Sequence, residues 1–218
     1  MKKVFALCFY FFSTFVYAND QSNYIDFIIK SFIQCDDSFF LNLFEFKQNL
    51  DDQMPIKEIN PNRAYIAVND RKKNANNYVQ FDKPILYQSL KLTGYYDNSL
   101  ALGEHGDYYF WGFSVDNSLQ DIRSKLDFLL WTEVEEESMY TSNMKIHFSD
   151  DSIEAWHDNL NTNIGVRTIP AQGTAEKLLL LEKTPNMNLL VCSLQGFFPP
   201  ELLTTIRPDL NKLEDHVK

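Results

Sequence analysis

The sequence lacks the short motifs by which the common hydrolases are identified. It contains no Gly-x-Ser-x-Gly elbow of the serine hydrolases and no His-Glu-x-x-His pair of the zinc peptidases. Only four histidines and three cysteines occur in 218 residues, so few side chains are available for nucleophilic or metal chemistry. Catalysis by a pair of carboxylates stays open, because the distance between two acids is invisible in a sequence.

Basic residues are also scarce, with 20 Lys and Arg against 30 Asp and Glu. Lys2 and Lys3 belong to an expected export signal, and without them 18 basic residues face 30 acids, a net charge of −12. Such a chain repels phosphate backbones and anionic membrane surfaces, which excludes both as expected partners. A cationic protein partner is favoured, although an acidic surface also serves solubility.

Long hydrophobic runs are absent beyond the first residues of the chain. The apolar run from Val4 to Ala18 follows two lysines and ends on a small residue, which is the pattern of a secretory signal peptide. It is shorter than the roughly 20 residues that span a bilayer. We therefore expect residues 1–18 to be removed, and residues 19–218 to form one α+β domain in the periplasm or outside the cell, without stable membrane insertion.

The expected mature chain has two cysteines, Cys35 and Cys192, near its opposite ends. In an oxidising compartment an even pair is more often bridged than free, so we predict a disulfide bond. The chain-entropy model gives a loop of this length about 4–5 kcal/mol of stabilisation. The alternative is two separate buried thiols, since both cysteines lie beside apolar residues.

Apolar periodicity predicts an N-terminal αα hairpin over residues 22–50, with Cys35 at its corner. Its first helix has apolar residues at i, i+3, i+4 and i+7, beginning with Ile25, and Asp36 or Asp37 caps the second helix. β-Prone runs separated by Asn-, Asp- and Gly-rich turns follow. They are residues 64–68, 78–81, 85–95, 108–115, 177–183 and 188–194.

Two further helices are predicted to join this mainly antiparallel sheet. Asn117-Ser118 is an N-cap signal for a helix through Leu129, and Pro200 begins a helix through Ile206. Residues 151–160 are expected to form an additional short helix. Strand–strand–helix therefore occurs twice, at 85–130 and 177–206, which suggests a duplicated fold. The predicted class is α+β, with the αα hairpin packed on the sheet.

Charged and aromatic clusters supply the candidate interaction surfaces. The candidate partner-binding residues form an acidic run, Glu133, Glu135, Glu136 and Glu137. Two further candidate contact surfaces are a basic tip at residues 71–73 and an aromatic patch of Tyr95, Tyr96 and Tyr108. For each run of charges, the alternative is a simple solvated loop.

One cluster has the residue types of a metal site. If residues 150–160 are helical, Asp150, Glu154 and His157 share a face, with His147, Asp151 and Asp158 nearby. However, that face flanks the apolar stripe instead of pointing inward, and capping explains the acids equally well. His105, between two acids in a turn, is a weaker acid–base candidate. We predict no catalytic residue, metal site or cofactor.

These observations favour a periplasmic or secreted binding protein, most plausibly an immunity-like inhibitor that neutralises a secreted effector. The alternative is a hydrolase of cell-envelope material that uses carboxylates, or His147 and His157 with a metal. A carrier of small ligands would require a large apolar pocket.

Overall fold

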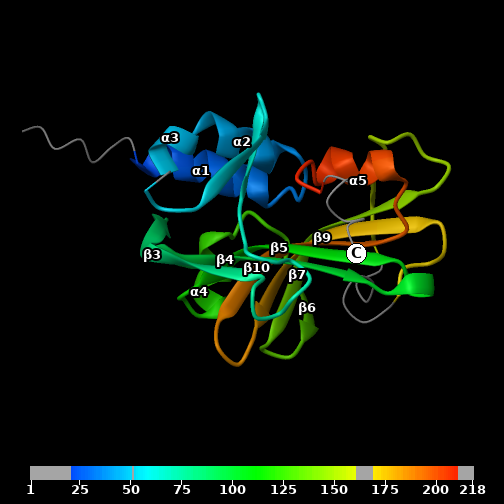
Figure 1. The fold of residues 1–218 in the computed structure, drawn as a ribbon. Coiled ribbons are helices and arrows are strands. Elements are labelled where there is room, and N and C mark those ends of the chain that lie inside the picture. Colours follow the sequence, from blue (N-terminus) through cyan, green and yellow to red (C-terminus); the bar gives the residue numbers. More distant parts are fainter. Residues whose placement is uncertain (1–20, 51, 161–168, 211–218) are drawn as a thin grey trace, which may run out of the picture.

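The computed structural model describes residues 21–50, 52–160 and 169–210 (Figure 1). The predicted signal peptide lies outside these residues. The α-helices of the described chain are α1 (Gln21–Phe32), α2 (Ser38–Glu45), α3 (Lys47–Leu50), α4 (Leu119–Lys125) and α5 (Pro200–Ile206). The strands are β1 (Ile56–Asn60), β2 (Arg63–Ile66), β3 (Tyr78–Tyr87), β4 (Leu90–Ala101), β5 (Asp107–Val115), β6 (Thr132–Glu135), β7 (Met139–Phe148), β8 (His157–Asp158), β9 (Thr174–Lys183) and β10 (Asn188–Gly196).

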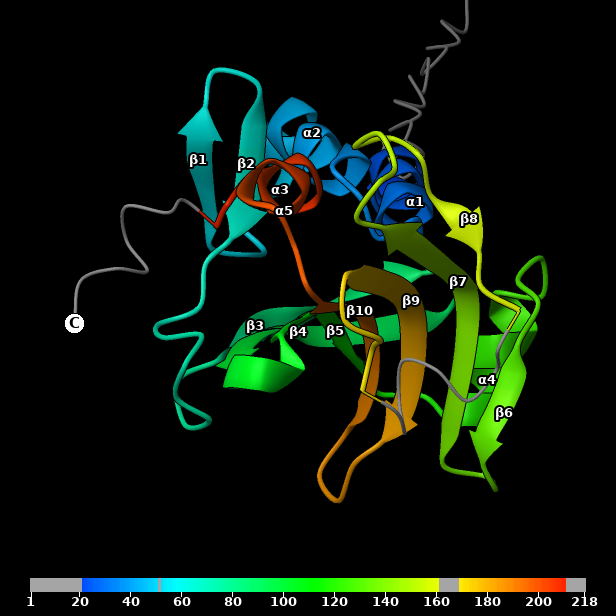
Figure 2. The same cartoon turned by 90° about the vertical axis from the view of Figure 1, so that its right-hand side faces the viewer.

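The main sheet has eight strands, in the order β3-β4-β5-β10-β9-β7-β6, with β8 paired to β7. All its neighbouring pairs are antiparallel. It twists so strongly that β3 and β4 run across the view of Figure 2 while β6 and β7 stand nearly upright. A separate β1–β2 hairpin stands beside α2. The predicted α+β class, with two helices beyond the N-terminal hairpin, is confirmed.

Helices α1, α2 and α5 lie together on one side of the sheet (Figure 1). The predicted apolar stripe of α1 is buried there, from Ile25 to Phe32. Phe32 packs edge-on against Phe113 of β5 and Phe39 of α2, with ring centroids 5.0 and 5.3 Å apart. Each such side chain contributes roughly 1.5–3 kcal/mol by leaving water, so this interface is the main core of the fold.

The predicted repeat of strands and helix is present in the topology. The meander β3–β4–β5 leads into α4, and the strands β7, β9 and β10 lead into α5. The last strands of the two units, β5 and β10, pair antiparallel at the centre, with Trp111 opposite Cys192. Counted outward from this pair, the strands of the first unit are β5, β4 and β3, and those of the second are β10, β9 and β7. Each unit thus runs in reverse chain order away from the centre, as a two-fold relation between the units requires.

The strand predicted over residues 85–95 is wrong. Chain reversal occurs at Gln88 and Ser89, which have φ values of 47° and 73°. Two consecutive positive φ angles are typical of the tight turns that match the twist of a β-hairpin. The predicted run therefore contains the end of β3, the turn and the beginning of β4. Without Asn-Gly or Asp-Gly at this turn, the sequence gives no signal for it.

A buried ion cluster lies between β4, α5 and the loop before β3. Arg207 is fully buried, and its Nη2 lies 2.9 Å from Asp97 Oδ2 and 2.8 Å from Asp209 Oδ2. Arg71 pairs with the same two carboxylates, through Nε at 2.8 Å to Asp97. The cluster balances two positive against two negative charges, and Trp111 stacks beneath the Arg207 guanidinium at 4.6 Å.

This cluster corrects two surface predictions. Arg71 is not part of a solvated basic tip, because it closes the ion cluster, whereas the neighbouring Lys73 forms an exposed pair with Asp70. Tyr95 is only 1% exposed and lies in the core, so it is not part of an aromatic surface patch. The sequence does not show either contact: Arg71 meets Asp209 of the C-terminal segment, and Tyr95 packs against Phe39 of α2 and Phe113 of β5.

Removing Arg207 should strongly destabilise the protein. Arg207→Ala leaves Asp97 and Asp209 buried with Arg71 as their remaining partner, and breaking a buried pair in this way costs about 3–5 kcal/mol. Lys73→Ala is the control, because an exposed pair contributes at most about 1 kcal/mol. Urea unfolding at neutral pH measures both. Equal losses for the two variants would contradict a structural role for the cluster.

The same cluster should make stability sensitive to acid. Burial alone raises the pKa of Asp209, but the charges of Arg207 and Arg71 outweigh burial and hold the pKa below its ordinary value. A lowered folded-state pKa gives stabilisation that is present above the unfolded-state pKa and is lost as the pH falls through the folded-state value. The free energy of unfolding should therefore fall less steeply below about pH 5 in Asp209→Asn than in the wild type. Parallel pH profiles would contradict this assignment.

Candidate functional site

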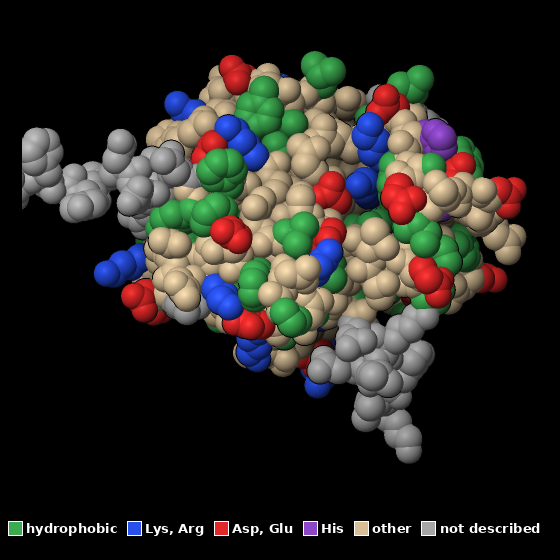
Figure 3. All heavy atoms as spheres, turned by 90° about the horizontal axis from the view of Figure 1, so that it is seen from above, with side chains coloured by type: hydrophobic (Ala, Val, Ile, Leu, Met, Phe, Trp, Pro, Cys, Tyr) green, Lys and Arg blue, Asp and Glu red, His purple; other side chains and the backbone are tan. Residues whose placement is uncertain are grey.

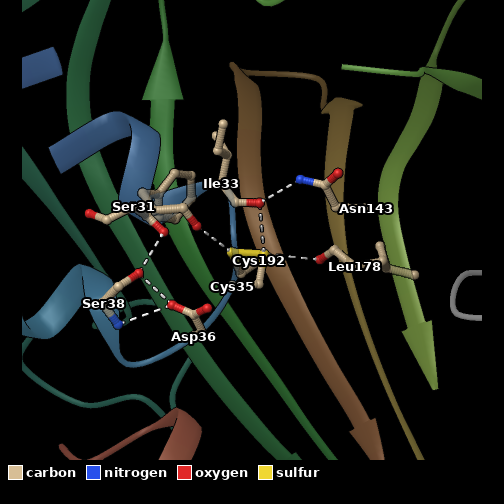
Figure 4. The surroundings of a disulfide bond; sticks show 9 residues. Ser31, Ile33, Cys35, Asp36, Ser38, Asn143, Leu178 and Cys192 are labelled. Atoms are coloured by element: carbon tan, nitrogen blue, oxygen red, sulfur yellow. Dashed lines mark hydrogen bonds between the residues drawn. A yellow bond between two sulfur atoms is a disulfide. The ribbon is translucent and has the colours of Figure 1, made fainter. Parts of the chain in front are cut away.

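The corner between α1 and α2 carries the disulfide bond (Figure 4). The Sγ atoms of Cys35 and Cys192 are 2.08 Å apart and their Cα atoms 5.4 Å apart, which confirms the predicted pair. Cys192 lies on β10, in the middle of the sheet. The bond therefore attaches the N-terminal helices directly to the strand that joins the two halves of the sheet.

Polar contacts hold the same corner on the sheet. Cys35 has a φ of 52°, in the left-handed region that ends α1. The Asn143 side chain of β7 donates to Ile33 O at 3.0 Å, and Cys35 Sγ lies 3.5 Å from Leu178 O of β9 (Figure 4). The corner is thus fixed against three neighbouring strands.

Asp36 bonds to the first residue of α2, although Asp37 occupies the N-cap position and makes no side-chain bond to the helix backbone. Its Oδ1 accepts a hydrogen bond from Ser38 N at 3.0 Å, and the Ser38 hydroxyl donates to Ser31 O at 3.4 Å (Figure 4). Asp37 instead pairs with Arg63 of β2, with Arg63 Nε 2.7 Å from Asp37 Oδ1. Of the two predicted caps, Asp36 is therefore the one that makes a side-chain bond to the helix terminus.

The predicted acidic run forms the β6–β7 hairpin. Glu133 and Glu135 lie on β6 and bond within the hairpin: Glu133 Oε1 accepts from Glu137 N at 2.9 Å, and Glu135 accepts from the Ser138 hydroxyl at 3.3 Å. Glu136 and Glu137 are exposed at the turn. The run thus divides into two acids that shape the hairpin and two that face solvent.

Helix α4 faces this hairpin across a groove of about 730 Å³, which we call the α4–β6 groove. Ser118 caps α4 as predicted, since its hydroxyl accepts from Asp121 N at 3.1 Å. Trp131 donates from Nε1 to Leu126 O at 3.2 Å and so fixes the loop after the helix. The groove is lined mainly by polar, aromatic and charged side chains, among them Arg123, Asp127, Trp131, Glu137, Tyr140 and Lys183.

A stacked arginine and tyrosine form the wall of the α4–β6 groove. The Arg123 guanidinium lies 4.0 Å from the centre of the Tyr140 ring, and the Tyr140 hydroxyl donates to Glu133 at 3.0 Å. The hydrogen bonds from Glu137 N and Tyr140, with the charge of Arg123, lower the pKa of Glu133. Desolvation and the Glu133 carboxylate raise the pKa of Tyr140. The groove therefore presents a neutral phenol, a carboxylate and a cation in one fixed arrangement.

No pattern in the sequence identifies Arg123, Trp131 or Tyr140 as site residues. Arg123 occupies a polar position of an amphipathic helix, and the aromatics occupy ordinary strand and loop positions. Only the packing of α4 beside β7 brings the guanidinium over the ring. The acidic run, by contrast, can be recognised in the sequence because its members are close together in the chain.

The predicted helix over residues 151–160 is wrong, so the candidate metal-ligand face that depended on it does not form. Asp158 pairs with Lys145, and His157 with Ile146, in the β7–β8 ladder. Strand pairing with β7 therefore overrides the local helical pattern. Within the described ranges, no group of three His, Cys, Asp or Glu is placed to hold a metal ion.

The histidines of this region have local partners. His147 is buried, with its ring 5.3 Å from that of Trp156 and its Nε2 3.0 Å from Ser152 O. The exposed His157 Nε2 lies 3.1 Å from Asp151 Oδ2, and this carboxylate also accepts from Phe148 N, which lowers its pKa. His105 is exposed in the turn before β5, 3.8 Å from Glu104.

No family model, curated protein or solved structure matches this chain. Among the described residues, no helix is long and apolar enough to cross a membrane.

Loss of the disulfide should destabilise the fold while leaving its core in place. The double variant Cys35→Ser, Cys192→Ser avoids a lone reactive thiol and should lower the free energy of unfolding by roughly 2–5 kcal/mol, because the unfolded chain regains the freedom of a long loop. Urea unfolding of the two proteins measures this difference. An unchanged unfolding midpoint in the variant would contradict the prediction. As a separate check, thiol titration of the unfolded wild type should detect no free sulfhydryl from this pair.

Proposed function

We propose that this chain is an exported binding protein that neutralises another protein by attachment at the α4–β6 groove and the adjoining β6–β7 turn. The observation that carries the proposal is the Arg123–Tyr140 stack beside the exposed acids Glu136 and Glu137. The partner is a protein with basic and apolar side chains. An immunity-like inhibitor of a secreted effector has these properties.

The composition of the groove supports binding to a protein. Arginine, tyrosine and tryptophan are the residues most enriched among the side chains that dominate binding energy at interfaces. Arg123, Tyr140 and Trp131 are held by the contacts described above, so little side-chain freedom remains to be lost on association. The loop that carries Trp131 also exposes Phe128 and Leu130, at 54% and 90%. Large exposed apolar side chains beside a polar groove are typical of recognition surfaces.

The charge of the turn favours a cationic partner. Glu136 and Glu137 lie at the exposed tip of the hairpin, where charges increase association rates and select partners more than they add affinity. The whole chain carries a net charge of −10, so the attraction extends beyond the turn. On the opposite, helix-covered face, drawn in Figure 3, acidic and basic side chains are interspersed.

Export is the second part of the proposal. Disulfide bonds persist in oxidising compartments, and Cys35–Cys192 joins distant parts of the chain. Together with the predicted signal at residues 1–18, the bond favours the periplasm or the extracellular space. The metal-dependent form of the hydrolase alternative loses its support, because residues 151–160 are not helical and do not place Asp150, Glu154 and His157 on one face.

Substitutions in the groove should weaken partner binding without unfolding the protein. Tagged protein is used to capture partners from periplasmic extract, and affinities of the purified partner are then measured by calorimetry. Arg123→Ala and Leu130→Asp should each weaken binding at least about tenfold, as expected for central interface residues. Glu136→Lys with Glu137→Lys should slow association, and increasingly so at low salt.

Matched controls test whether the groove itself is responsible. Leu86→Asp introduces the same charge at another exposed leucine, 63% exposed on β3, and Glu104→Lys reverses an exposed acid far along the chain from the hairpin. Both should bind like the wild type. If the groove variants retain the wild-type affinity, or if the controls lose as much, the proposed surface is wrong.

A further inference from the structure

A second cleft, of about 640 Å³, lies beside the disulfide corner and is independent of the α4–β6 groove. It opens between the α1–α2 corner, α5, β7 and the loop before β8. We call it the Lys177 cleft. Its lining includes Asp36, Asn143, Glu154, Trp156, Lys177 and Ile206.

Lys177 occupies an inward-facing position of β9. It alternates with Leu179 and Leu181, which are both fully buried on the side of the sheet that the helices cover. Lys177 itself is only 8% exposed. A lysine at such a position loses most of its hydration, so its ammonium needs another source of stabilisation.

Within the described part of the chain, the Lys177 ammonium donates no hydrogen bond and forms no ion pair. The ammonium lies over the ring of Trp156, whose centre is 4.9 Å from Nζ. The neighbouring charges are engaged elsewhere: Lys145 pairs with Asp158, and Asp37 pairs with Arg63. The cleft therefore contains a desolvated cation with an aromatic face beside it and no anion in direct contact.

We propose that the Lys177 cleft binds a ligand that carries one carboxylate and an aromatic or apolar group. The carboxylate contacts the Lys177 ammonium, and the apolar group lies against Trp156 and Ile206. A single negative charge suits the site better than a phosphate dianion, since Asp36 and the exposed Glu154 also line the cleft and repel additional charge.

The charges around Lys177 are consistent with this role. Burial lowers its pKa, Asp36 opposes this effect, and the like charge of Lys145 adds to it. A carboxylate bound at Nζ would stabilise the ammonium and recover part of the desolvation cost. The disulfide corner fixes the geometry, because it holds Asp36 on one wall and Asn143 on another (Figure 4).

The test compares two probes that differ only in charge. N-acetylphenylalanine carries a carboxylate and an aromatic ring, and N-acetylphenylalanine amide is its neutral counterpart. Binding to the disulfide-bonded protein is measured by NMR titration, following the indole signal of Trp156. The acid should bind at least about tenfold more tightly than the amide, the ratio expected for one charge-assisted contact.

Variants then assign the contact to Lys177. Lys177→Met should weaken binding of the acid at least about tenfold and leave binding of the amide unchanged. Lys83→Met, at an exposed lysine of β3 that does not line the cleft, should change binding of the acid less than about threefold. If Lys177→Met does not fold, Lys177→Gln is used in the same comparison.

Three outcomes would overturn the proposal. Equal affinities of the wild type for the acid and the amide would exclude a role for the carboxylate. Absence of binding for both probes at roughly 10 mM would exclude a cleft for this class of ligand. A loss of acid binding in Lys83→Met equal to that in Lys177→Met would show a general effect of surface charge.

Discussion

The attachment of the α1–α2 corner to the centre of the sheet is the constraint on which the rest of the structure depends. One side of a twisted sheet has to be covered, and α1 and α2 provide that cover for the strands around β5 and β10. The Cys35–Cys192 bond fixes the position of this cover covalently. The corner also sets the wall of the Lys177 cleft, so packing and the candidate ligand site share one element.

The two halves of the sheet meet at β5 and β10, where hydrogen bonds join strands that are distant in the sequence. Over Trp111, in the middle of this seam, the ion cluster of Arg207 replaces apolar packing. Buried ion pairs contribute little net stability compared with well-packed apolar groups, yet they are costly to break. Their effect here is to specify where the segment after α5 lies, since only Asp209 at that place completes the charge balance with Arg207.

The two candidate surfaces differ in physical character. The α4–β6 groove is open and combines a cation, aromatic rings and acids, a composition suited to a protein partner. The Lys177 cleft contains one desolvated ammonium beside a tryptophan, which suits a small charged group. The two surfaces share no lining residue, although β7 and β9 contribute to both.

The sequence by itself determined the N-terminal helical hairpin, the antiparallel sheet, the cap at Ser118 and the pairing of Cys35 with Cys192. These features depend on local periodicity, on capping chemistry, or on the presence of two cysteines after the predicted signal peptide. Tertiary structure decided the rest. Residues 151–160 became turns and β8 because the ladder with β7 outweighs local helical preference. Arg71, Tyr95, Arg123 and Lys177 received their roles only when distant segments met, because burial and charge pairing depend on distances in space that a linear sequence does not contain.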